Sequence, residues 1–216
     1  RRAVEGGGTL SPDALARCAW AATALDGPDA AALFEGCARR IAQRAGELTG
    51  KQLVTIAYAA ARKRGPVDAA LFDAVADGIA NRTHELDAQG LSNAAFAYAT
   101  ARRRDPMLFA SVARAARVFD AFEPRHAASL AWSYSKAGVR APQLYNALAL
   151  SCAPRLVAFD SKQVSTLAWA YARAGRLDRE PLRGALAREV NLRCTAHTFS
   201  AQSLANVAWS FAKPEH

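Results

Sequence analysis

The chain has 216 residues, of which 51% are hydrophobic and 22% are charged. This composition supplies a packed core and excludes an intrinsically disordered chain. It contains no run of about 18 apolar residues, so we expect no membrane-spanning helix and no membrane insertion. The formal net charge of +9 favours a polyanionic partner, although a basic composition alone is a weak signal.

The N-terminal residues 1–9 contain three consecutive glycines and are interpreted as a flexible leader. The remaining residues, 10–216, are interpreted as a single repeat domain because one pattern recurs through them. An alanine followed by an aromatic residue occurs six times, with intervals of about 36 to 40 positions between the rings. The pairs are Ala19-Trp20, Ala57-Tyr58, Ala95-Phe96, Ala131-Trp132, Ala168-Trp169 and Ala208-Trp209. A period in this range is typical of stacked helical repeats.

Each pair is predicted to lie in the first helix of its repeat, which we call the A helix. Nine residues before each ring stands a side chain that we expect to cap the start of the helix. These residues are Ser11, Thr49, Asp87, Glu123, Asp160 and Ser200. Two of them, Thr49 and Asp160, have a glutamine three residues later, which is the spacing of a capping box. Three A helices are expected to end at Gly65, Gly138 and Gly175.

A second helix, the B helix, is predicted after each of the first five A helices. Its apolar residues begin twelve or thirteen positions after the ring and recur at helical spacing. These positions are Leu33-Phe34, Leu71-Phe72, Leu108-Phe109, Leu144-Tyr145 and Leu182. We therefore predict an all-α fold: a right-handed α-solenoid of five helical hairpins, each of about 36 to 40 positions, plus the first helix of a sixth. Because the sixth repeat stops after one helix, we expect the chain to be a segment of a longer protein.

One face of each A helix is predicted to be polar, and stacking of the repeats aligns these faces into a groove. Positions −7, −3, +1 and +4, counted from the ring, share this face because a helix turns by about 100° per residue. Position +1 is always Ala or Ser, and we expect it to be open. Hydroxyl and amide groups at −7 and −3 are suited to base edges, and basic groups are suited to phosphates. The base-facing candidates are Arg17, Thr55, Asn93, Ser129, Thr166, Asn206, Gln89 and Gln202, and the phosphate candidates are Lys51, Arg62, Arg125, Lys136, Lys162, Arg173 and Lys213.

We call the polar face formed by positions −7, −3, +1 and +4 the polar stripe. Two of its features have alternative interpretations. The polar residues could be no more than solvated, with the basic groups at +4 serving the dipole at the C-terminal end of the helix. The rings at position 0 could stack on bases, but we favour their packing in the seam between adjacent A helices. Charge favours the C-terminal repeats as the site of closest RNA contact. Residues 1–105 carry 14 Lys and Arg against 12 Asp and Glu, whereas residues 106–216 carry 14 against 7.

No pattern of catalytic or metal-binding residues is recognisable in the sequence. The four histidines lack the spacing of metal ligands, and no pair of carboxylates suggests acid–base chemistry. We therefore expect a protein that is not an enzyme and has no metal, no cofactor and no small-molecule substrate. The four cysteines stand singly in helical pattern, which favours reduced thiols in an intracellular or organellar-matrix compartment.

The segments of residues 128–138, 165–175 and 204–213 resemble the octotricopeptide and heptatricopeptide repeats of organellar RNA-binding proteins, which often accompany a RAP domain. Repeats one and two depart most from the pattern, because Ala22 and Ala60 replace its second aromatic residue. No RAP domain is recognisable. The resemblance implies non-catalytic binding of ribosomal RNA or an organellar transcript in the mitochondrial matrix, with the chloroplast stroma as the alternative. It makes an accessory component of the mitochondrial ribosome, next to ribosomal proteins, a reasonable setting.

A protein-binding scaffold is the alternative function. In that case the same groove holds a helix or an extended peptide. The response to salt discriminates the two functions, because contacts with many phosphates weaken steeply as salt rises and an apolar peptide groove does not.

Overall fold

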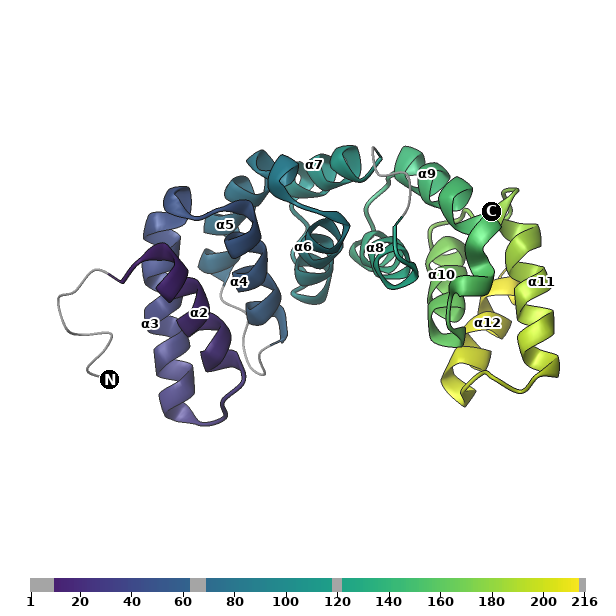
Figure 1. Ribbon diagram of the computed structural model, residues 1–216, viewed down its shortest axis with the longest axis horizontal. Coiled ribbons are helices and arrows are strands. Elements are labelled where there is room, and N and C mark those ends of the chain that lie inside the picture. Colours follow the sequence, from purple (N-terminus) through teal and green to yellow (C-terminus); the bar gives the residue numbers. More distant parts are fainter. Residues whose placement is uncertain (1–9, 63–68, 118–121, 214–216) are drawn as a thin grey trace. The chain divides into compact units, whose positions relative to one another are not determined.

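The structure is a computed structural model that describes residues 10–62, 69–117 and 122–213 (Figure 1). The expected leader (residues 1–9) and the expected helix end at Gly65 lie outside the described residues.

The described residues form eleven α-helices and no strand, which confirms the predicted all-α fold of helical hairpins. The A helices are α2 (Pro12–Thr23), α4 (Gly50–Arg62), α6 (Ala88–Thr100), α8 (Pro124–Ala137), α10 (Ser161–Arg173) and α12 (Ala201–Ala212). The B helices are α3 (Pro28–Arg44), α5 (Ala69–Asn81), α7 (Pro106–Ala116), α9 (Pro142–Cys152) and α11 (Leu182–Thr195). Short 3-10 helices η1 (Ala45–Glu47), η2 (Thr83–Glu85) and η3 (Ala153–Ala158) follow α3, α5 and α9. All six rings of the repeat lie in A helices, as predicted. Within the described residues, none of these helices has the length and apolarity needed to cross a membrane.

The chain divides into two compact units, Arg1–Val112 (unit 1) and Ala113–His216 (unit 2). In unit 1, α2 packs against α4 and α4 against α6, and in unit 2, α8 packs against α10 and α10 against α12. Figure 1 shows this succession of hairpins from purple to blue in unit 1 and from green to yellow in unit 2. The interpretation of residues 10–216 as one domain stays a prediction.

Side-chain caps start five of the six A helices as expected. The side chains of Ser11, Asp87 and Ser200 each accept a hydrogen bond from the backbone N–H three residues later. Thr49 and Asp160 form the predicted capping boxes, in which a glutamine side chain also accepts from the N–H of the cap residue. These bonds satisfy N–H groups that have no partner within the helix, so they fix where each A helix begins.

The predicted cap at Glu123 is wrong. Its side chain makes no capping hydrogen bond and instead pairs with Arg125, with 2.9 Å between Oε2 and Nε. Ser, Thr, Asn and Asp are the side chains that cap well, and glutamate is not among them. Pro124 at the first helical position still favours the start of α8, because proline has no N–H that would need a partner.

Three A helices end in a left-handed residue six positions after the ring. Gly138 and Gly175 have φ of 66° and were predicted as helix ends. Arg102 occupies the same position in the third repeat with φ of 55°. Glycine adopts this conformation without steric cost, whereas the Cβ of an arginine makes it strained. The third repeat therefore ends in the same geometry at a cost in stability.

In α6 and α10, a buried tyrosine two positions after the ring joins the A helix to the preceding hairpin. Tyr98 donates from its hydroxyl to the carbonyl O of Phe72 over 2.7 Å, and Tyr171 donates to the carbonyl O of Tyr145 over 2.6 Å. Both rings are almost fully buried, and both meet the aromatic ring of the acceptor residue edge to face. These contacts supply packing and hydrogen bonding between neighbouring repeats. In α12, by contrast, Phe211 at the same position is 39% exposed.

In four of the repeats, an arginine near the end of the hairpin is hydrogen-bonded to the start of the same hairpin. In each case a guanidinium N–H donates to a backbone carbonyl that lies shortly before the A helix of the same hairpin. The pairs are Arg44 with Leu10 (2.7 Å), Arg82 with Gly46 (2.9 Å), Arg155 with Phe122 (2.9 Å) and Arg193 with Phe159 (2.6 Å). We call these pairs the arginine clasps. They were not predicted from the sequence, although an arginine recurs 23 or 24 positions after the ring in these repeats.

Candidate nucleic-acid interface

A groove of about 870 Å³ lies on the A helices of unit 2. Two lining residues are the rings Trp132 and Trp169, and four others occupy the predicted −7 and −3 positions of the fifth and sixth repeats: Lys162, Thr166, Gln202 and Asn206. The structure thus brings the predicted stripe residues of α10 and α12 together in one hollow. The remaining lining residues were not predicted and come mostly from the starts of the two helices: Asp160, Ser161, Ser165, Thr198, Ser200 and Ser203.

Most side chains that line the groove are polar, and their charges nearly cancel. Apart from Lys162 and Asp160, its polar side chains are hydroxyls and amides. The hydroxyl of Thr166 donates to the carbonyl O of Lys162 over 2.7 Å, so its one proton is used and its lone pairs remain to accept. The amide of Asn206 offers both donors and an acceptor. This combination suits planar groups that carry donors and acceptors along their edges, as nucleobases do.

Side chains at −7 are exposed in all six repeats, and those at −3 are exposed or half-buried, as a solvent-facing stripe requires. The expectation that position +1 is open is wrong for five repeats, because Ala59, Ala97, Ser133, Ala170 and Ser210 are buried. A small side chain at +1 allows close approach of neighbouring A helices. Ser133 and Ser210 satisfy their buried hydroxyls by donating to the carbonyl O four residues earlier. Packing between adjacent A helices therefore covers position +1 of the stripe in these five repeats.

Basic side chains at +4 contact the end of the preceding A helix in unit 2. The Nε of Arg173 donates to the carbonyl O of Ser135 over 3.2 Å, and the Nζ of Lys213 donates to the carbonyl O of Ala172 over 2.9 Å. Both acceptors lie in the last turn of the preceding A helix, where positive charge is favourable, and each also accepts from a backbone N–H. These contacts are to the neighbouring helix, so they do not test the alternative that the +4 groups serve the dipole of their own helix. Their assignment as phosphate ligands stays a prediction.

The rings at position 0 are not buried in the seam as we expected. Trp132 and Trp169 are half-buried, whereas Trp209 is 43% exposed. Adjacent rings nevertheless contact one another along each unit: the centroids are 6.3 Å apart for Trp169 and Trp209, and 6.4 Å apart for Trp20 and Tyr58. The rings therefore lie over the seam between A helices, with part of their surface in solvent.

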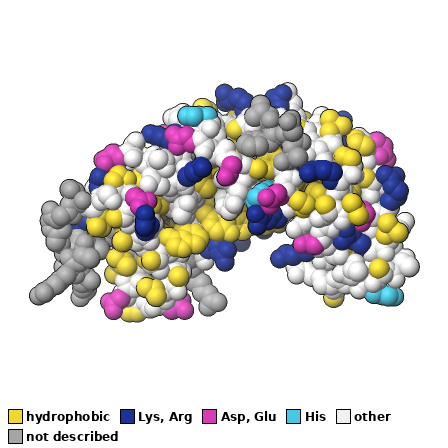
Figure 2. Space-filling view, in the orientation of Figure 1, with side chains coloured by type: hydrophobic (Ala, Val, Ile, Leu, Met, Phe, Trp, Pro, Cys, Tyr) yellow, Lys and Arg dark blue, Asp and Glu magenta, His cyan; other side chains and the backbone are white. Residues whose placement is uncertain are grey.

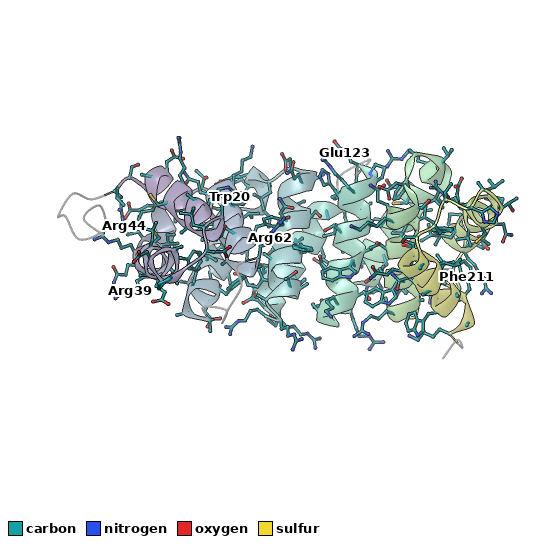
Figure 3. All side chains as sticks on the ribbon, turned by 90° about the horizontal axis from the view of Figure 1, so that it is seen from below. Trp20, Arg39, Arg44, Arg62, Glu123 and Phe211 are labelled. Atoms are coloured by element: carbon teal, nitrogen blue, oxygen red, sulfur yellow. The ribbon has the colours of Figure 1, made fainter. Side chains whose placement is uncertain are left out.

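The same stripe is present in unit 1, on the helices that carry Trp20 and Arg62 (Figure 3). In α4 the exposed side chains of Lys51, Thr55 and Arg62 occupy its −7, −3 and +4 positions. The guanidinium of Arg62 lies over the ring of Tyr58, 5.6 Å from its centroid. In α6 the candidates Gln89 and Asn93 are exposed and half-buried, respectively. Each unit thus presents its own polar stripe edged by aromatic rings.

The charged candidates differ in whether they form ion pairs within the protein. Arg17 pairs with Asp13, and Arg125 pairs with Glu123, so both charges are partly compensated on the surface. Lys51, Lys136 and Lys162 are exposed, which leaves their ammonium groups accessible to a phosphate. Ser129, the remaining base-facing candidate, is half-buried in α8.

Charge alone does not identify the binding face. On the face shown in Figure 2, Lys and Arg side chains are interspersed with Asp and Glu side chains. The interface is therefore assigned from the groove and its lining. Within the described part of the chain, no three His, Cys, Asp or Glu side chains are grouped so that they could hold a metal ion.

A comparison with protein families matches the chain to a family named for RNA editing. The family described as RNA-editing substrate-binding complex 6 protein (RESC6) matches residues 19–187, which extend from the ring of the first repeat into α11. The match thus covers one wall of the groove, α10, whereas α12 lies beyond it. No curated protein matches the chain.

Proposed function

The chain belongs to the RNA-editing substrate-binding complex 6 protein family, and from this premise we propose that it binds single-stranded RNA along the polar stripe of its A helices, without catalysing a reaction. The groove of unit 2 carries this proposal. It combines hydroxyl and amide groups, aromatic rings and an exposed lysine, which are the groups that recognise bases and phosphates.

The chemistry of the groove supports an unpaired strand rather than a duplex. In double-stranded RNA, base edges are largely inaccessible and recognition rests on shape, phosphates and 2′-hydroxyls. Hydroxyl and amide side chains beside Trp132 and Trp169 suit bases that are unstacked and turned toward the protein. An apolar helix or peptide would instead require a groove with an apolar floor. The groove is instead lined by the polar side chains of Thr166, Gln202 and Asn206 beside the two rings.

The family name supports an RNA-editing complex as the setting, with RNA and neighbouring proteins of that complex as partners. Mitochondria are the location that we propose, in agreement with the organelle that the repeat resemblance implies. The octotricopeptide type of repeat and a ribosomal role are not part of the family description, and both stay predictions of that resemblance.

A comparison of two matched double variants tests the proposal. Lys136→Met with Lys162→Met removes two exposed charges from the stripe, and Arg179→Met with Arg188→Met removes two exposed charges near and on α11. We expect the stripe variant to bind a labelled single-stranded RNA more weakly, with a salt slope flatter by about 1.4, since each phosphate contact on a single strand contributes about 0.7. Fluorescence anisotropy over a series of salt concentrations measures both quantities.

The α11 variant should retain the affinity and the salt slope of the unchanged protein. Equal weakening by both variants would show that only overall charge matters, and it would contradict the stripe. Absence of RNA binding by the unchanged protein would refute the proposed function and leave the scaffold as the remaining interpretation.

A further inference from the structure

The aromatic residues of the A helices fall into two classes in the structure. The rings two positions after position 0, such as Tyr134 and Tyr171, are 0% and 2% exposed and belong to the core. The rings at position 0 in the same helices, Trp132 and Trp169, are half-buried and form part of the groove wall. The first class thus packs entirely within the protein. The second class keeps part of a large aromatic surface in solvent, beside polar groups.

The indole of Trp169 is held in place by two neighbours. The ring of Trp209 lies 6.3 Å away at an interplanar angle of 34°. The guanidinium of Arg173 lies 5.4 Å from the centroid of the indole, and it is itself fixed by its hydrogen bond to the carbonyl O of Ser135. A ring that is already ordered loses little side-chain freedom when a ligand stacks on it. The side chain of Trp169 is therefore ordered before a ligand binds, with Arg173 over part of its ring.

Polar groups line the same groove as Trp169. Thr166 is three residues before Trp169 on α10, so the two side chains share one face of the helix. Asn206 lines the groove from α12. Aromatic stacking tolerates every base, whereas the acceptor of Thr166 and the amide of Asn206 distinguish bases by their edges.

We propose that Trp132 and Trp169 are base-stacking platforms, on which successive unpaired bases of the RNA lie while the hydroxyl and amide groups of the groove contact their edges. This inference rests on the proposed function and adds to it the way in which the bases are held. It requires an unpaired strand, because a base within a duplex has both faces covered by its neighbours.

Substitution of one ring tests the inference. Trp169→Leu keeps an apolar side chain but removes the aromatic face, and Trp169→Phe keeps a smaller aromatic ring. We expect Trp169→Leu to weaken binding of a single-stranded oligouridine about 10-fold and Trp169→Phe to weaken it about 3-fold or less. The salt slope should be the same in both variants, because neither removes a charge. The melting temperature checks that each variant is folded.

Indole fluorescence gives an independent test that does not depend on the stability of the leucine variant. A protein with Trp20→Phe and Trp209→Phe retains only the two groove tryptophans, since the chain has four. We expect their emission to be quenched at saturating oligouridine. Unchanged emission, or full affinity of Trp169→Leu, in a protein that still binds RNA with steep salt dependence would overturn stacking and leave the proposed function intact. Absence of RNA binding altogether would remove both.

Discussion

The ammonium group of Lys213 donates a hydrogen bond over 2.9 Å to the carbonyl O of Ala172, which lies 41 residues earlier at the end of the neighbouring A helix. The same ammonium group lies 5.5 Å from the centroid of the Trp209 ring. Arg173 makes the equivalent two contacts one repeat earlier, with Ser135 and Trp169. In the fifth and sixth repeats, the basic side chain at +4 thus joins adjacent A helices and contacts the ring of its own helix.

We predict that a +4 group that contacts the preceding A helix, as Lys213 does, contributes to stability as well as to RNA binding. Lys213→Met should lower the free energy of unfolding by about 1 kcal/mol, because a hydrogen bond from a charged group is lost at a partly exposed position. Lys136→Met is the matched control: Lys136 is exposed, and its substitution should change stability by less than about 0.5 kcal/mol. Urea unfolding measures both values. Equal stability of the two variants would show that the Lys213 contact contributes nothing.

The arginine clasps should contribute more than surface charges do. Arg193 has a side chain that is only 15% exposed, and it contacts the carbonyl O of Phe159 and the carboxylate of Glu189. We expect Arg193→Met to destabilise unit 2 by about 2 to 3 kcal/mol, since it leaves a half-buried carbonyl and a half-buried carboxylate without their donor. Arg188→Met, at an exposed position on the same helix, should be nearly neutral. A loss below about 0.5 kcal/mol for Arg193→Met would contradict this role.

The left-handed end of α6 offers a stabilising substitution. Arg102→Gly should raise the free energy of unfolding by about 0.5 to 1 kcal/mol, because it relieves the strain of a positive φ and this gain exceeds the added freedom of the unfolded chain. Gly138→Ala introduces the same strain at the equivalent position of the fourth repeat and should destabilise by a similar amount. Thermal unfolding measures the two shifts, which should have opposite signs.

Alkaline pH should destabilise the fold. Burial raises the pKa of the Cys152 thiol from 9.0 to about 12, against a smaller lowering by Arg155. The folded-state pKa exceeds that of the unfolded chain, so the stabilisation is fully present below pH 9 and is lost as the pH rises from 9 to 12. Burial also raises the pKa of Tyr98 and Tyr134, which adds to the loss at the upper end. We expect the melting temperature, followed by circular dichroism, to fall over this range, and a constant value would contradict the burial of these groups.

The sequence was sufficient to predict the fold because the repeat specifies the phase of every helix. A ring that recurs after about 36 to 40 positions, with a capping side chain nine residues earlier, marks the A helices without any tertiary information. The polar stripe was predictable for the same reason, and Lys162, Thr166, Gln202 and Asn206 do lie together in the groove.

Depth of burial could not be predicted in this way. Some side chains lie at the boundary between the polar and apolar faces of a helix. Whether such a side chain is covered depends on how closely adjacent helices approach, and the repeat pattern does not give that distance. Position +1 was therefore expected to be open although Ser133 is buried, and position 0 was expected to be covered although Trp169 is half-exposed. The arginine clasps were missed for a different reason. Their signal, an arginine 23 or 24 positions after the ring, lies at the end of the B helix, where the repeats were not aligned.

Cross-linking of bound RNA tests the central claim most directly. A single-stranded RNA that contains 4-thiouridine, irradiated in complex with the protein and analysed by mass spectrometry, identifies the peptides that the bases touch. We predict cross-links to the A helices of unit 2, α8, α10 and α12, above all to peptides that contain Trp132, Thr166 or Trp169. Cross-links confined to the B helices α9 and α11 would contradict the claim.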